Sequence, residues 1–150
     1  KGMVNVQLQT AYHLFDWFHY LFNFHAANRP FPYPEKLIDT CLDLFRRKDL
    51  TEAFNHMCGF WEIDWVFCVN RATRQTKYRF EECRQALHEE GLELVKMLSK
   101  TENLSDVRRA DDLHMLFGTT CALAEVQLAL PGEFQTDISL KNVLDRRPFI

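Results

Sequence analysis

Three long segments of this chain are apolar on almost every side of a helix, and this feature restricts the fold most. They are expected to form helices over residues 4–27, 49–72 and 110–130. A helix that is apolar all round has to be enclosed by other elements, because a face left in water would expose hydrophobic surface. Two amphipathic segments separate them, so the sequence predicts an all-α fold in which buried and surface helices alternate.

The two amphipathic segments are expected to be helices over residues 34–47 and 78–99, each with one apolar stripe and one charged face. A proline-rich connection at residues 30–34 ends the first helix, because proline cannot continue it. Short connections place neighbouring helices antiparallel in hairpins. The three apolar helices are therefore expected to be parallel, with their N-termini at one rim of a bundle or partial ring.

The composition agrees with a single all-α domain over residues 3–150. With 150 residues, of which 47% are apolar, the chain can bury a sizeable core. Only 5 Gly and 5 Pro are present, too few for the many tight turns of a sandwich or barrel of short strands. Lys1 and Gly2 precede Met3 and resemble a remnant left by cloning, so they are set apart from the domain.

Charge and cysteine usage argue against several classes of function. The net charge is −3 and no long basic run is present, so no nucleic-acid partner is expected. Charged and polar residues interrupt the apolar run at residues 11–27, so no membrane span is expected. The five cysteines form no C-x-x-C pair and are odd in number, which favours free thiols and a cytoplasmic location.

The few polar residues of the apolar segments fall into narrow stripes, at 100° per residue around each helix. Each segment has a histidine in its N-terminal half, namely His13, His56 and His114. Glu62 shares the stripe of His56, whereas Asp64 lies on the opposite side of that helix. Because a buried carboxylate without a partner is costly, these groups are expected to line a polar cavity or to form internal pairs and helix caps.

The cavity interpretation gives specific residues a role. Histidine titrates near neutral pH and burial can raise a carboxyl into the same range, so two such groups can exchange protons with a substrate. The candidates for proton transfer are His56, His114, Glu62, Asp16 and Asp112, and the candidates for substrate binding are His13, Trp61 and Trp65. No H-x-x-x-H or H-E-x-x-H spacing supports a three-histidine metal site, so no metal or other cofactor is expected.

The alternation over residues 4–130, together with the stretches at residues 60–65 and 116–125, resembles part of an (α/α) toroid. This six-hairpin class houses many glycoside hydrolases and polysaccharide lyases. The resemblance implies a carbohydrate pocket at one end of the inner ring, with aromatic rings stacked on sugar and carboxylates or histidines as acid and base. A full toroid has many more helices than this chain offers, so a second copy or the remainder of a longer chain would complete it.

Two hypotheses about function follow. The first is an enzyme or enzyme fragment that cleaves glycosidic bonds in a carbohydrate, or acts on another small molecule, by acid/base chemistry. It predicts an open polar cavity at the N-terminal rim of the apolar helices. The second is a non-catalytic helical interaction domain that forms a homo-oligomer or packs against a partner, and it predicts a large apolar interface.

Overall fold

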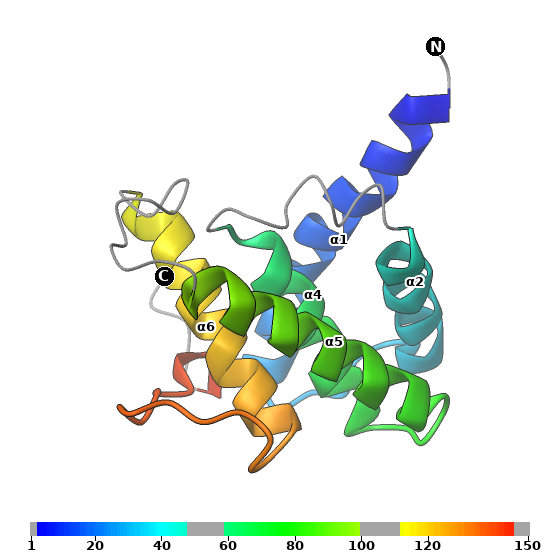
Figure 1. Cartoon of the computed structure of the whole chain (residues 1–150). Helices are drawn as coiled ribbons and strands as arrows, with labels where there is room; N and C mark the ends of the chain where they lie inside the picture. The colour runs from blue at the N-terminus through cyan, green and yellow to red at the C-terminus, as the bar shows by residue number, and fades with distance from the viewer. Residues whose placement is uncertain (1–2, 48–58, 100–111, 146–150) are drawn as a thin grey trace.

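The fold is all-α, as predicted. The computed structural model describes residues 3–47, 59–99 and 112–145, with side chains from residue 13 onward. No strand is present in these ranges (Figure 1). The helices are α1 (Met3–Ala26), α2 (Pro34–Arg46), α4 (Trp61–Thr73), α5 (Phe80–Ser99) and α6 (Leu113–Ala129), followed by the short 3₁₀ helix η2 (Val143–Asp145).

Local sequence sets where α2 and α6 begin. Pro34 is the first residue of α2, a position where its missing N–H breaks no helical hydrogen bond. Asp112 caps α6, because its carboxylate accepts the backbone N–H groups of His114 and Met115 at 2.9 and 3.4 Å. Asp112 has an extended backbone, so α6 begins after this residue and not at Ala110 as the sequence suggested.

The helix predicted over residues 49–72 differs from the structure near its start. α4 begins at Trp61, and neither Gly59 nor Phe60 is helical; the residues before Gly59 lie outside the described part. The N–H of Gly59 donates to Oγ1 of Thr119 on α6 at 3.0 Å. The prediction of one unbroken helix through these two residues is wrong, because this backbone is bonded to another helix instead of to a preceding helical turn.

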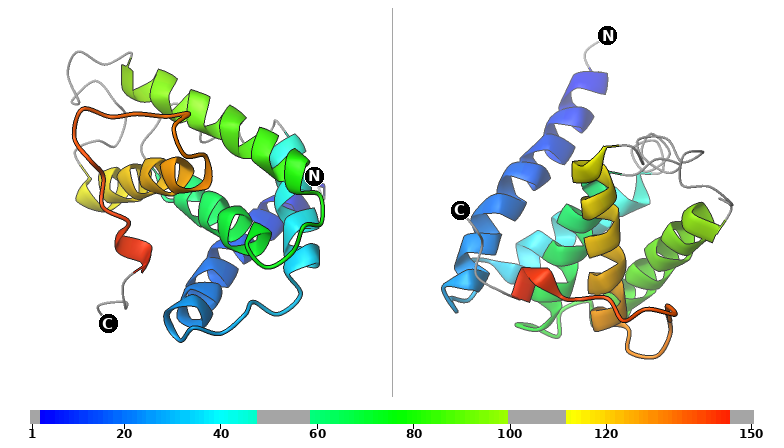
Figure 2. Two further views of the ribbon diagram at one scale, coloured as in Figure 1. Left: turned by 90° about the horizontal axis from the view of Figure 1, so that it is seen from below. Right: turned by 90° about the vertical axis from the view of Figure 1, so that its left-hand side faces the viewer.

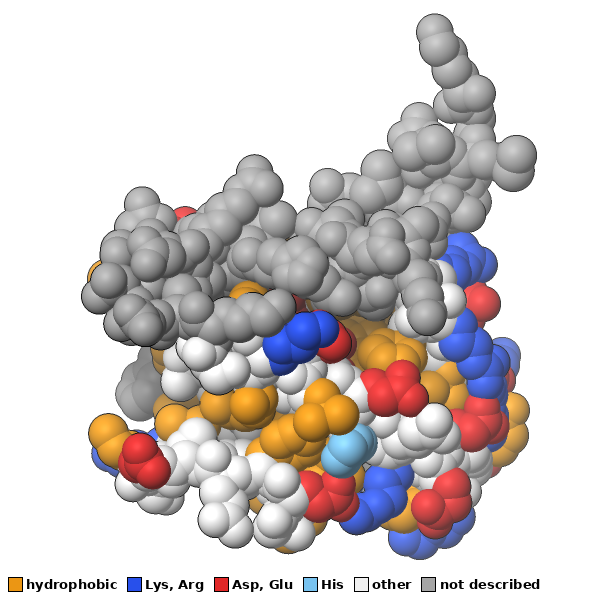
Figure 3. All heavy atoms as spheres, viewed as in Figure 1, with side chains coloured by type: hydrophobic (Ala, Val, Ile, Leu, Met, Phe, Trp, Pro, Cys, Tyr) orange, Lys and Arg blue, Asp and Glu red, His pale blue; other side chains and the backbone are white. Residues whose placement is uncertain are grey.

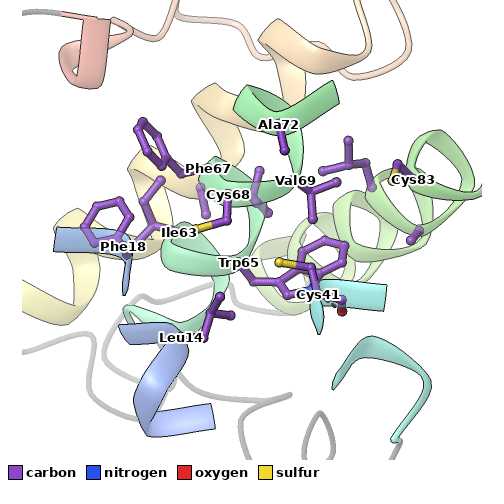
Figure 4. Close-up of a cluster of buried hydrophobic side chains, with 14 of the residues drawn as sticks. Leu14, Phe18, Cys41, Ile63, Trp65, Phe67, Cys68, Val69, Ala72 and Cys83 are labelled. Atoms are coloured by element: carbon purple, nitrogen blue, oxygen red, sulfur yellow. Dashed lines mark hydrogen bonds between the residues drawn. The ribbon is translucent and has the colours of Figure 1, made fainter. Parts of the chain in front are cut away.

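α4 is the central helix of the structure. Every residue from Trp61 to Thr73 is buried, and α4 packs against α1, α2, α5 and α6. Figure 4 shows the apolar core around it, to which α1 contributes Leu14 and Phe18 and α5 contributes Cys83. The enclosure predicted for the middle apolar helix is therefore confirmed for the part of it that the structure describes.

α1 and α6 are enclosed over only part of their circumference. On α1, Trp17 and Tyr20 are 45% and 54% exposed, and on α6, Leu113 and Phe117 are 81% and 57% exposed. The prediction that these two helices are enclosed on all sides is wrong, because the described helices cover each of them on one part only: α4 packs on α1, and α4 and α5 pack on α6. Even so, none of the described helices combines the length and apolar character needed to cross a membrane.

The described helices alternate in direction. In Figure 1, α1, α4 and α6 start toward the top and run downward, whereas α2 and α5 run back. The right-hand view of Figure 2 agrees with this arrangement for α1 and α6. The N-terminal ends of the three apolar helices therefore lie toward one rim, as the alternation predicted.

Charged side chains gather over α2 and the start of α5, on the right of Figure 3. Arg79 bridges Asp39 and Glu82 with N···O distances of 2.6 and 2.8 Å, and Arg46 also pairs with Glu82. This is the solvent-facing surface that the amphipathic pattern of the two segments predicted.

Candidate functional site

A cleft of about 320 Å³ lies between α1 and α6, and residues at the start of α4 form its floor. Both flanking helices pack on α4, and the right-hand view of Figure 2 shows η2 between the lower parts of α1 and α6. Its volume lies at the lower end of the range of about 300–1,000 Å³ that is typical of small-molecule sites. Most of its wall is apolar, and the aromatic lining residues are Phe15, Phe18, Phe22, Phe60 and Phe117.

Contacts between aromatic rings hold the walls of the cleft in place. Phe15 of α1 meets Phe60 nearly edge to face, with ring centroids 5.4 Å apart, and Phe60 lies 5.8 Å from the imidazole of His114. Phe18 meets the buried ring of Phe67 on α4 edge to face at 5.2 Å. Because edge-to-face pairs are favourable and directional, rings from α1 and the start of α4 form one continuous aromatic wall.

Gly118 allows α6 to approach the start of α4 closely. A Cβ atom at this position would lie 2.6 Å from the carbonyl oxygen of Gly59, closer than real Cβ contacts. The next residue, Thr119, accepts the N–H of Gly59 in the same contact. The missing side chain therefore brings the first turns of α6, with His114, to the N-terminal end of the cleft.

Three lining residues are polar, and they come from three different helices: His19 on α1, Asp64 on α4 and His114 on α6. Asp64 is 3% exposed, and burial raises the pKa of its carboxyl to about 8, with the nearby Glu62 adding to the rise. Within the described part of the chain, no hydrogen bond to this carboxyl is formed. Among the described residues, the cleft therefore contains one buried acid that no hydrogen bond satisfies, together with two exposed imidazoles.

Glu62 is also buried, but it does not line the cleft. Burial, together with a smaller effect of the charge of Glu90 on α5, raises the pKa of its carboxyl to about 8. Burial likewise raises the pKa of Glu90 to about 7. Oε2 of Glu62 has no hydrogen-bond partner among the described residues. The two acids of the first turn of α4 thus lie in different surroundings, Glu62 near another acid on α5 and Asp64 in the cleft.

The residues predicted from sequence do not form one site. Of those that the structure describes, only His114 lines the cleft. Asp16 is exposed on α1, and Asp112 is the cap of α6. Trp61 and Trp65, the two predicted sugar-stacking residues, are 3% and 1% exposed. His56 lies outside the described residues.

The indoles of α4 belong to the core. Nε1–H of Trp65 donates to the carbonyl oxygen of Cys41 on α2 at 2.8 Å, and Phe45 stacks on the same indole. Figure 4 shows Trp65 pointing toward α2, away from α1. Because neither Trp61 nor Trp65 presents a face to solvent, a sugar cannot stack on them in this arrangement.

His13 lies in a second hollow, of about 300 Å³, between α1 and α2. Trp17 and the exposed ring of Tyr33 line it as well, and the ammonium group of Lys36 lies 5.1 Å from the centre of that ring. This hollow is separate from the cleft that holds His114. The histidines expected to converge are thus placed on different sides of α1, as far as they are described.

A buried ionic cluster lies at the other end of α4. Nη2 of Arg71 contacts Oε1 of Glu125 on α6 at 2.5 Å, and Nη1 lies 2.6 Å from Oδ1 of Asp145 in η2. The amide of Asn70 donates to the second oxygen of Glu125 at 2.7 Å. His25, at the end of α1, lies 3.5 Å from Asp145. The cluster connects α1, α4, α6 and η2, and its oppositely charged groups pair with one another.

Asp64 and Arg71 are the two polar residues whose importance the sequence did not reveal. Asp64 lies opposite the polar stripe on which Glu62 was noticed, and its position facing α1 and α6 depends on how α4 is rotated in the bundle. Arg71 stands where the apolar stretch of α4 gives way to polar residues, so the sequence does not show that its side chain is buried against Glu125. Neither residue belongs to a spaced motif that would have singled it out.

Comparison with protein-family models, curated proteins and solved structures finds no match for this chain. The described residues include no group of three or more His, Cys, Asp or Glu side chains arranged to hold a metal ion. The function of the chain is therefore inferred from the geometry and chemistry of the cleft.

Proposed function

We propose that this chain is a helical binding domain whose cleft between α1 and α6 accepts the apolar body of a small molecule. The observation that carries the proposal is the cleft itself, which is concave, about 320 Å³ in volume, and walled mainly by phenylalanine rings. Sites of this kind, mostly apolar with a few convergent polar groups, are where small ligands usually bind. Phe117, which lines the cleft and is 57% exposed, would lose water-exposed surface on binding.

The sparse polar lining favours an apolar ligand over a sugar. A sugar ring presents several hydroxyl groups, and each needs a hydrogen-bond partner when it leaves water. Among the described lining residues, only His19, Asp64 and His114 offer side-chain nitrogen or oxygen atoms. The match to an aromatic or aliphatic body is therefore better than the match to a carbohydrate.

Acid/base cleavage of a glycosidic bond is the second candidate, favoured by one observation. His114, which the sequence predicted as a proton-transfer residue, lines the same cleft as Asp64. Burial raises the pKa of Asp64 to about 8, so it carries a proton at neutral pH and has the protonation state of a general acid. Release of reducing ends from oligosaccharides, lost in Asp64→Asn, is the measurement that tests this candidate.

The main proposal is tested by titrating the protein with 2-phenylethanol, a small neutral aromatic probe, followed by calorimetry and ligand-detected NMR. Phe117→Ala removes an exposed wall of the cleft without opening a buried cavity. We expect it to weaken binding about five- to tenfold, the equivalent of losing one aromatic contact of about 1–1.5 kcal/mol. Leu113→Ala, on the same helix but outside the lining, is the matched control and should change binding less than twofold.

Two results would overturn the proposal. One is the absence of saturable binding by 2-phenylethanol and by aliphatic alcohols of similar size. The other is an equal loss of affinity in Phe117→Ala and Leu113→Ala, which would place the probe elsewhere. Light scattering on the same samples tests whether a second copy covers the open faces of α1 and α6, since Phe117→Ala would then shift the protein toward monomer.

A further inference from the structure

Asp64 occupies a position that its carboxyl would not favour on its own. It is 3% exposed and lines a cleft whose other residues are mainly phenylalanines and aliphatic side chains. An ionised carboxylate in such a place is costly unless a positive charge or hydrogen bonds offset the loss of water. The described lining of the cleft includes no Lys or Arg, and no described residue hydrogen bonds to this carboxyl.

The other buried acids near α4 do not share this situation. Glu125 is paired with Arg71, and Arg71 also contacts Asp145. Glu62 lies near Glu90, another acid, and does not line the cleft. Asp64 is thus the one described buried acid that lines an open cleft and lacks a cation.

From this arrangement we infer that the ligand of the cleft is an organic cation, an amine with an aromatic or aliphatic body, whose ammonium group pairs with Asp64. The inference rests on the proposed function, because it names the class of ligand for the same cleft. The ammonium group supplies the charge that the carboxyl lacks. The faces of rings such as Phe15, Phe18 and Phe60 attract a cation in addition, since the ring face is the negative end of its quadrupole.

The groups around Asp64 determine how binding depends on pH. The titratable side chains nearest to it are His19 on α1, His114 and Cys121 on α6, and Glu62 and Cys68 on α4 itself. α2 and α5 approach these groups from the other side of α4, through Cys41 and Glu90. Because ionisation of Asp64 adds a negative charge to the cleft, a cation should bind more tightly as pH rises.

The expected size of the pH effect follows from the ionised fraction of Asp64. Burial raises the pKa of this carboxyl to about 8, so at pH 6 and 7 the unliganded protein holds a proton there. A bound cation favours the ionised form and releases that proton to solvent. The ionised fraction rises about fiftyfold between pH 6 and pH 8, and the affinity for a permanent cation should rise by the same factor.

The experiment compares three probes that differ mainly in charge: 2-phenylethylammonium, 2-phenylethanol and 3-phenylpropanoate. At pH 7.5 we expect the wild-type protein to bind the ammonium about tenfold more tightly than the alcohol, and the carboxylate most weakly. In Asp64→Asn most of this preference should disappear, because the amide keeps the size of the side chain and removes its charge. Glu62→Gln, a neutralised buried acid on the same helix turn, is the matched control and should keep the tenfold preference.

The outcomes separate this inference from the proposed function. If the alcohol and the ammonium bind the wild-type protein equally, the cleft accepts apolar bodies but recognises no cation, and the inference is overturned while the proposed function stands. If none of the probes binds, both fail. If Asp64→Asn does not fold, the wild-type protein decides the matter with benzyltrimethylammonium, whose charge is fixed: a flat affinity between pH 6 and pH 8 overturns the inference.

Discussion

Arg71 offers the sharpest test of how this fold is held together, because its guanidinium is almost completely removed from water. Arg71 is 2% exposed, and its partner Glu125 is 1% exposed. Arg71→Met keeps most of the apolar stem and removes the charge. Glu125 then keeps the amide of Asn70 as its described hydrogen-bond partner, and the partly buried Arg74 is the described cation that still interacts with it. Asp145 stays half-exposed, so it remains solvated and contributes little to the cost.

The expected loss in the free energy of unfolding follows from the two states open to the Glu125 carboxylate once Arg71 is removed. It either stays charged, which in buried pairs costs about 3–5 kcal/mol, or it takes up a proton. Protonating a carboxyl with an ordinary pKa near 4.3 costs about 3.7 kcal/mol at pH 7 and about 1 kcal/mol at pH 5. The cheaper route applies at each pH, so Arg71→Met should lower the free energy of unfolding by about 3–4 kcal/mol at pH 7 and about 1 kcal/mol at pH 5.

Urea unfolding at the two pH values, followed by far-ultraviolet circular dichroism and tryptophan fluorescence, measures these differences. Adding Glu125→Gln to Arg71→Met should restore much of the stability at pH 7, because the neutral amide no longer needs a proton and still accepts from Asn70. Arg84→Met is the matched control: it removes an exposed pair with Glu133 and should cost less than about 0.5 kcal/mol. An equal loss at pH 5 and pH 7, or a double variant no more stable than Arg71→Met, would refute the reasoning.

Three further changes test other parts of the structure. Gly118→Ala should lower the free energy of unfolding by about 1–3 kcal/mol in urea titrations, because the new Cβ meets the carbonyl oxygen of Gly59, whereas Thr120→Ala on the exposed side of the same helix should be nearly neutral. Asp112→Ala should cost about 1 kcal/mol and Asp112→Ser almost nothing, as expected of a helix cap; a loss of ligand binding with unchanged stability would contradict the cap assignment. Burial raises the pKa of Glu62 to about 8, so its stabilising contribution is present below about pH 4.5 and is lost as pH rises toward 8. Glu62→Gln should therefore make the free energy of unfolding less dependent on pH across that range. An unchanged pH profile would argue against a buried neutral acid.

The helices could be predicted well from the sequence because their signals are local. Apolar periodicity and proline positions placed α2 at Pro34 and the end of α6 just before Pro131. The break at Gly59 was missed because it arises from a tertiary contact, the hydrogen bond to Thr119 on another helix. Local patterns contain no information about which distant residue will bond to a backbone N–H.

Enclosure was harder to predict than helix formation. An apolar helix face indicates that burial is favourable there, but not which element covers it. Three segments looked alike in sequence, yet only α4 is covered on all sides in the part of the chain that the structure describes, while Trp17 on α1 and Phe117 on α6 remain exposed. Which apolar helix is fully enclosed depends on the faces that α2 and α5 cover. α2 packs on α4, and α5 packs on both α4 and α6.

In the candidate site, too, some residues follow from local sequence signals and others depend on how the helices pack. His114 was singled out and does line the cleft, because the parallel arrangement of the apolar helices was predicted and is observed. The acid that lines the cleft together with His114 is Asp64 and not Glu62. Asp64 and Glu62 are two positions apart in the sequence, which places them about 200° apart around the helix. Two such side chains cannot face one cavity.

That angular separation also explains why the two acids should behave differently. The positive end of the α4 dipole favours a negative charge on either of them equally, since both lie in the first turn. Ionisation of Glu62 places a charge near Glu90 inside the protein, outside the described lining of the cleft. Ionisation of Asp64 places a charge in a cleft that a cation can enter. Of the two, only the Asp64 carboxyl should respond to a ligand, so a proton released on cation binding should disappear in Asp64→Asn and persist in Glu62→Gln.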